Sequence, residues 1–105
     1  MKNVILKRKV FTAVQKMCSA TLENHLCNIQ VNGQKRGCSG FIVNKATENC
    51  IYLTTESSVY QPLVGKYMYR YAKNTKDFTG EENQWADCFE TLVEKVAKYL
   101  MEGKR

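Results

Sequence analysis

The sequence contains one proline, Pro62, one histidine, His25, and no apolar run longer than the four residues from Cys50 to Leu53. A membrane-spanning helix needs about 20 apolar residues in succession, so none is expected. The start, MKNVILKRKVF, has three consecutive apolar residues before the cations at 7–9 interrupt them, which predicts no signal peptide. These absences favour a cytoplasmic protein.

Cysteine pairs at the short spacing of zinc sites are also missing. The five cysteines are an odd number without a CxxC motif, which favours free thiols in a reducing compartment. Structural zinc needs four converging ligands, and the available set is His25, Cys27, Cys38 and Cys50. The cysteine spacings of 11 and 12 are those of strand-to-strand repeats. No metal site is therefore predicted.

Motifs for catalysis and for phosphate binding are equally scarce. His25 and Cys27 would share one face of a strand, but no oxyanion motif or orienting acid lies nearby in the sequence. A small Cys/His enzyme is therefore the weakest alternative, and the sequence predicts no catalytic residue and no cofactor. Neither GxxxxGK[ST] nor GxGxxG occurs. In NGQKRGCSG, Lys35 and Arg36 lie among glycines, as either an anion-binding nest or a solvated hairpin tip.

What the chain does contain is typical of a globular protein, with 105 residues, 44% apolar and 25% charged. This length supports one core, so residues 1–105 are predicted to form a single domain. The net charge of +6 is uneven: residues 1–50 hold eight Lys and Arg against two Glu, and residues 51–105 hold eight against eight acids. Such a one-sided positive field suits a polyanion or an acidic protein surface.

Hydrophobic periodicity divides the first half into a helix and a hairpin. Helical spacing over about 8–23 is shown by Val10, Val14, Met17, Cys18 and Leu22. Residues 26–31 then alternate with a period of two, and Asn32-Gly33 predicts a type I′ turn into a strand at 34–44. A two-residue loop would place Cys27 opposite Cys38 and Ile29 opposite Arg36. A bulge at Gly37 or Gly40 would change that pairing.

The second half begins with strands predicted at 49–55 and 66–73, joined by the loop SSVYQPLVG. A turn-rich connection, NTKDFTGEENQ, leads to a helix predicted at 86–102. Its apolar face would comprise Trp85, Phe89, Leu92, Val93, Val96 and Leu100. Asp87 and Glu90 have the spacing of a capping box at its amino end. The prediction is a two-layer α+β sandwich, with an antiparallel sheet of three to four strands and both helices covering one face.

The order helix, strands, helix resembles the double-stranded RNA-binding domain. That resemblance implies lysines at the start of the second helix, where they would grip phosphates. Here the matching stretch is GEENQWADCFE. The acids Glu81, Glu82, Asp87 and Glu90 in it oppose RNA binding in that mode.

The segment GKYMYRYAK places Tyr67, Tyr69 and Tyr71 on one face of a strand and Arg70 on the other. Tyrosines on the open face of the sheet, joined by Tyr52, would form a stacking platform for bases. Tyrosines facing the helices would leave Arg70 exposed. The second orientation is favoured because burying an unpaired arginine is costly.

Two function classes follow. The first is an interaction or inhibitor module that acts through its basic surface on an acidic protein partner or on a nucleic-acid-processing protein. It is similar in general character to accessory proteins of phages and mobile elements, including inhibitors of bacterial defence systems. The alternative is a nucleic-acid- or nucleotide-binding module. The neutral second half favours the first class, and pairing of sheet edges in a homodimer stays open. The predicted binding residues are Lys7, Arg8, Lys9, Lys35, Arg36, Tyr67, Tyr69, Arg70 and Tyr71.

Overall fold

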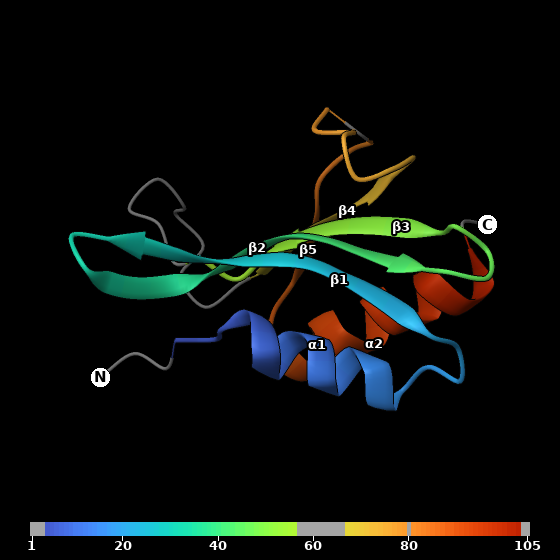
Figure 1. Cartoon of the computed structure of the whole chain (residues 1–105), viewed down its shortest axis with the longest axis horizontal. Helices are drawn as coiled ribbons and strands as arrows, with labels where there is room; N and C mark the ends of the chain where they lie inside the picture. Colours follow the sequence, from blue (N-terminus) through green and yellow to red (C-terminus); the bar gives the residue numbers. More distant parts are fainter. Residues whose placement is uncertain (1–3, 57–66, 80, 104–105) are drawn as a thin grey trace.

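A computed structural model describes residues 4–56, 67–79 and 81–103, which form one antiparallel sheet with two helices on one face (Figure 1). The elements are α1 (Lys7–Lys16), β1 (Leu22–Val31), β2 (Gln34–Asn44), β3 (Cys50–Thr54), β4 (Tyr67–Ala72), β5 (Gln84–Ala86) and α2 (Phe89–Glu102). The strands are neighbours in sequence order. The predicted α+β sandwich is confirmed, with five strands instead of three or four. The predicted loop at 57–65 lies outside the described residues.

Helix α1 is shorter than predicted because the chain reverses after Lys16. The side chain of Gln15 stabilises the reversal: its Nε2 donates to the Ala20 carbonyl oxygen at 2.8 Å, and its Oε1 accepts from the Leu22 N–H at 3.2 Å. Leu22 already belongs to β1, which therefore starts four residues before the predicted position. Cys18 and Leu22 are both buried in the same core, one before the reversal of the chain and one after it. Their helical spacing therefore does not indicate a continuous helix.

The predicted turn between β1 and β2 is confirmed. Asn32 and Gly33 both have positive φ angles, 53° and 77°, as a type I′ turn requires. The first pairs beyond it, Val31 with Gln34 and Gln30 with Lys35, follow the register of a two-residue loop.

A bulge then shifts the register by one residue between Ile29 and Gln30. Ile29 pairs with Gly37, and Cys27 pairs with Ser39, so the predicted Ile29–Arg36 and Cys27–Cys38 pairs are wrong. Gly37 makes the bulge feasible, because its φ is 146° and a Cβ there would lie 3.0 Å from the Glu56 backbone. The two cysteines consequently face opposite sides of the sheet.

The burial of the thiols leads to a testable prediction. Cys27 and Cys88 are exposed, whereas Cys18, Cys38 and Cys50 are buried. Burial, followed by the negative charge of Asp77, raises the pKa of Cys50 to about 11, and burial also raises the pKa of Cys18 and of Cys38.

In the folded protein at pH 8, we expect iodoacetamide to modify the two exposed cysteines at least about tenfold faster than the three buried ones, because the thiolate is the nucleophile. Peptide mass spectrometry over time measures each site. Rapid modification of Cys38, or its crosslinking to Cys27 by a short dithiol-reactive reagent, would contradict the register.

Helix α2 begins at Phe89, three residues after the predicted start. Residues 84–86 instead pair with β4 as a short edge strand, in which Trp85 lies opposite Met68. The structure therefore removes Trp85 from the predicted apolar helix face and leaves it 41% exposed. Cys88 is the N-cap and makes no side-chain capping hydrogen bond, so the predicted capping box is wrong, although Glu90 does lie in the first turn.

The core lies between the sheet and the helices. It includes the fully buried Val10, Val14, Ile42, Ile51, Leu53, Leu92, Val96 and Leu100. Side chains of α1 and α2 at helical spacing thus meet strand residues at a spacing of two, which is the packing expected for helices on one sheet face.

Candidate functional site

The first turn of α1 consists of Lys7, Arg8 and Lys9, all exposed. The turn contains no acidic residue, and the N-cap residue Leu6 has no side chain that can accept from the helix N–H groups. The positive end of the helix dipole therefore adds to three positive side chains. The backbone N–H of Lys7 donates to Asn28 Oδ1 of β1 at 2.8 Å, which fixes this turn beside the hairpin.

The other two predicted cations, Lys35 and Arg36, lie near the hairpin tip at the same end of the molecule (Figure 1). Thr55 connects the two segments, since its Oγ1 donates to the Ile5 carbonyl oxygen at 2.6 Å and accepts from the Cys38 N–H at 3.0 Å. These contacts attach the start of α1 to the hairpin, and the cations of both segments lie at this end of the molecule. We call Lys7, Arg8, Lys9, Lys35 and Arg36 the basic end. Within the described residues, Arg36 Nε is buried without a hydrogen-bond partner.

The tyrosines of β4 face the helices, as the favoured interpretation predicted. Tyr69 is buried in the core, and Tyr67 and Tyr71 pack against it. The Tyr71 ring stacks on Tyr99 of α2, with centroids 4.3 Å apart. Tyr52 pairs with Arg70 on the opposite face and does not join them. These three tyrosines therefore offer no stacking platform on the open face.

Arg70 points to the open face, as predicted, but it is only 9% exposed. The expectation of an exposed arginine is wrong because the segment after β4 folds over it. Nη2 donates to the Phe78 carbonyl oxygen at 2.6 Å, and the guanidinium lies 4.3 Å from the centroid of the Tyr52 ring. Its Nε is buried without a hydrogen-bond partner among the described residues.

An aromatic cluster surrounds Arg70 on this face. Phe41 lies edge-on to Tyr52 and Phe78, with centroid distances of 5.1 and 5.3 Å. Phe41 also packs with Cys50 and Ala72 in a small second core. Phe78 is 66% exposed. The cluster therefore uses most of its aromatic surface to cover the sheet, and it presents one ring to solvent.

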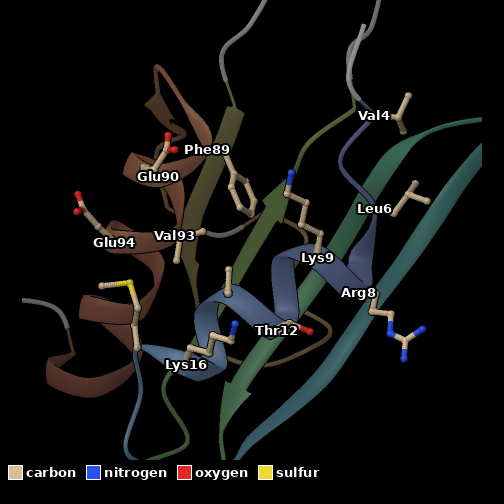
Figure 2. A pocket seen from close by; sticks show the side chains of 12 residues that line it. Val4, Leu6, Arg8, Lys9, Thr12, Lys16, Phe89, Glu90, Val93 and Glu94 are labelled. Carbon is tan, nitrogen blue, oxygen red and sulfur yellow. The ribbon is translucent and has the colours of Figure 1, made fainter.

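The outer face of the helix layer contains a groove of about 820 Å³ between α1 and α2. Figure 2 shows Lys9, Thr12 and Lys16 along α1, and Glu90 and Glu94 along α2. Arg8 and six apolar side chains complete the lining, the apolar ones being Val4, Leu6, Ala13, Met17, Phe89 and Val93. Cations on α1 and carboxylates on α2 consequently border an apolar hollow.

No pattern in the sequence predicts this groove, although some of its residues belong to predicted surfaces. Arg8 and Lys9 belong to the predicted basic surface, and Met17 was assigned to the apolar helix stripe. Met17 is instead 53% exposed beside the groove. The groove forms between segments more than 70 residues apart in the sequence. The sequence therefore indicates it only through the charges of the two helices, which are all basic in the first helix and acidic at the start of the second.

The remaining candidates do not converge. His25 and Cys27 share the open face of β1, but His25 Nε2 lies 3.2 Å from Glu23 Oε1. Among the described residues, no three His, Cys, Asp or Glu side chains gather as they would around a metal ion.

Comparison of the chain with protein-family models, with curated proteins and with solved structures found no match. Neither described helix is long and apolar enough to cross a membrane.

Proposed function

We propose that this chain is a non-enzymatic interaction module that binds an acidic surface of a partner protein through the basic end. One observation carries the proposal: two segments of the chain place their cations at one end of the molecule, where the first turn of α1 already has the positive end of a helix dipole.

The three cations in the first turn of α1 lower the free energy of unfolding. A cation at the amino end of a helix is unfavourable by roughly 0.3–1 kcal/mol. Lys9 recovers part of this cost, since its Nζ lies 5.2 Å from the centroid of the Phe89 ring. Lys7 and Arg8 are exposed. Residues that break a local rule are those expected to serve binding.

A protein partner fits this surface better than a nucleic acid. Glu90 and Glu94 border the same groove as Arg8 and Lys9, and their carboxylates repel a phosphate backbone. The tyrosines of β4 are turned toward the helices, which removes the stacking component of the nucleic-acid alternative. A partner with separate acidic groups avoids both problems. If the partner is an enzyme and the module covers its acidic active site, the module acts as an inhibitor.

The test is the affinity for a short peptide whose glutamates are separated by glycine and serine, and for a single-stranded oligonucleotide of equal charge, measured by fluorescence anisotropy. We expect the peptide to bind more tightly. Changing Lys7→Glu and Lys35→Glu together is expected to weaken peptide binding about tenfold or more, equivalent to at least about 1.4 kcal/mol.

A matched control changes Lys95→Glu and Lys98→Glu, two exposed cations of α2, with the same effect on net charge. This control is expected to bind almost as well as the original protein. Thermal unfolding of both double variants verifies that they are folded, and Lys7→Glu alone is expected to raise the midpoint, because an acid suits the first turn. Equal losses in both double variants, or tighter binding of the oligonucleotide, would refute the proposal.

A further inference from the structure

The groove between α1 and α2 leaves apolar side chains in contact with solvent. Val4 and Met17, which line it, are 45% and 53% exposed, and they are two of the five exposed large apolar side chains in the described part of the chain. Phe89 and Val93 line the groove from the α2 side (Figure 2). An apolar hollow bordered by charged residues is typical of an interaction site.

The charges at the two sides of the groove have opposite sign. Helix α1 has no acidic residue, and it lines the groove with Arg8, Lys9 and Lys16. Helix α2 lines the groove with Glu90 and Glu94, one helical turn apart. A surface with one positive and one negative side is complementary to itself once the two sides are exchanged.

The two helices also have matching positions along the groove, which permits that exchange. Lys9 Nζ lies 5.2 Å from the Phe89 ring centroid near the start of both helices. Cys18 Sγ lies 3.9 Å from the Ala97 carbonyl oxygen, nine residues further along one segment and eight along the other. The helices therefore run in the same direction, and residues about 80 apart in the sequence lie beside each other along the groove. Lys9 is thus at the same position along the groove as Glu90, the residue after Phe89.

A two-fold axis along the groove would place α1 of each protomer over α2 of the other without changing these positions. Lys9 would then face Glu90 of the partner subunit, and Lys16, the cation further along α1, would approach the partner's Glu94. A two-fold axis across the groove would instead place each helix over its own copy and oppose like charges. Closed two-fold symmetry is the commonest arrangement of homo-oligomers.

We infer that the groove is the interface of a symmetric homodimer, in which α1 of one protomer packs against α2 of the other. The four helices form a central layer, with the apolar floor of each groove covered by the partner and the charged rows paired at its borders.

This symmetry has a consequence for the basic end. An axis parallel to the helices preserves their direction, so both hairpin tips and both α1 starts lie at the same end of the dimer. Lys7, Lys35 and Arg36 do not line the groove, and they remain available there in two copies. The dimer itself does not depend on the function proposed above, because its evidence is the groove and its charges.

The experiment uses two variants, Lys9→Glu and Glu90→Lys. Native mass spectrometry and sedimentation velocity are expected to detect a dimer for the original protein. For each variant alone, the dissociation constant is expected to rise about tenfold or more. Each dimer contains the Lys9–Glu90 contact twice, so each single change opposes like charges at both places.

Mixing the two variants is the decisive step. One chain then carries Glu at positions 9 and 90, and the other carries Lys at both, so every contact across the interface is again between opposite charges. We expect heterodimers of the two masses to form from samples that are separately monomeric. Lys98→Glu, a charge reversal outside the groove lining, is expected to leave dimerisation unchanged.

Circular dichroism of each variant verifies that it is folded. A monomer for the original protein at the highest soluble concentration would overturn the inference. Failure of the folded variants to assemble on mixing would also overturn it, as would dimers that neither substitution weakens, since these would place the interface elsewhere, for example at the β1 edge.

Discussion

Replacing Gly40 with alanine is expected to destabilise the protein by about 3 kcal/mol or more, through combined backbone strain and overpacking. Gly40 lies in β2 opposite Leu26, with a φ of 138° that residues with a side chain rarely adopt. A Cβ there would meet the His25 carbonyl oxygen and lie 2.9 Å from Leu26 Cα. Both atoms belong to the backbone of β1, so no side chain can rotate away.

The loss is large against the roughly 5–15 kcal/mol that stabilises a typical domain. Urea unfolding followed by circular dichroism measures it. Gly33→Ala is the matched control, because Gly33 also has a positive φ, 77°, but nothing lies within 4 Å of a Cβ built there. We expect the control to cost about 1 kcal/mol from φ alone. Equal costs at both positions would show that β1 does not approach Gly40 closely.

The second large effect is expected at Asn44, where alanine should cost about 2–4 kcal/mol, because a fully buried side chain is lost together with the hydrogen bonds that it makes. Asn44 is 1% exposed at the end of β2. Its Nδ2 donates to the Leu100 carbonyl oxygen at 2.8 Å, and its Oδ1 accepts from the Ala46 N–H at 2.9 Å. One side chain thus stabilises the β2–β3 turn and also donates to one of the last carbonyl oxygens of α2. Such carbonyl oxygens have no N–H partner within the helix.

Asn49→Ala provides the comparison. Asn49 Nδ2 reaches the same Leu100 carbonyl oxygen at 3.2 Å, but the residue is only half-buried. Its loss is expected to cost less than about 1 kcal/mol, the net value of an ordinary hydrogen bond. Thermal unfolding of both variants gives the difference. If Asn49→Ala costs as much as Asn44→Ala, the side chain of Asn44 is not the main connection between the turn and α2.

Much of the fold was predictable from local patterns. Asn32-Gly33 predicts its turn because few residue pairs tolerate two positive φ angles. The alternation of Tyr69 and Arg70 predicts that one faces the helices and the other the open side, and the cost of burying a cation selected the correct orientation.

The errors arose where long-range contacts override a local pattern. Leu22 keeps helical spacing with Cys18, yet the chain reverses between them and both residues reach the core. Trp85 has helical spacing with Phe89, yet it pairs with Met68 in a strand. Hydrophobic periodicity reports which residues are buried together, and it does not report the path of the chain between them.

The candidate site was predictable only in part. Lys7–Lys9 and Lys35–Arg36 were identifiable as charge, but their meeting at one end depends on Asn28 and Thr55, which join distant segments. No single segment predicts the groove, since its two sides come from opposite ends of the chain.

The amino-acid sequence by itself determined the α+β class, the hairpin turn, the excess of cations in the first half and the inward face of β4. These properties depend on φ preferences and on side-chain periodicity, which act over a few residues. The tertiary structure alone decided the bulge register, the burial of Arg70 beneath Phe78 and the pairing of a basic helix with an acidic one. These depend on contacts between residues far apart in the chain, where the space left by one segment determines what another can occupy.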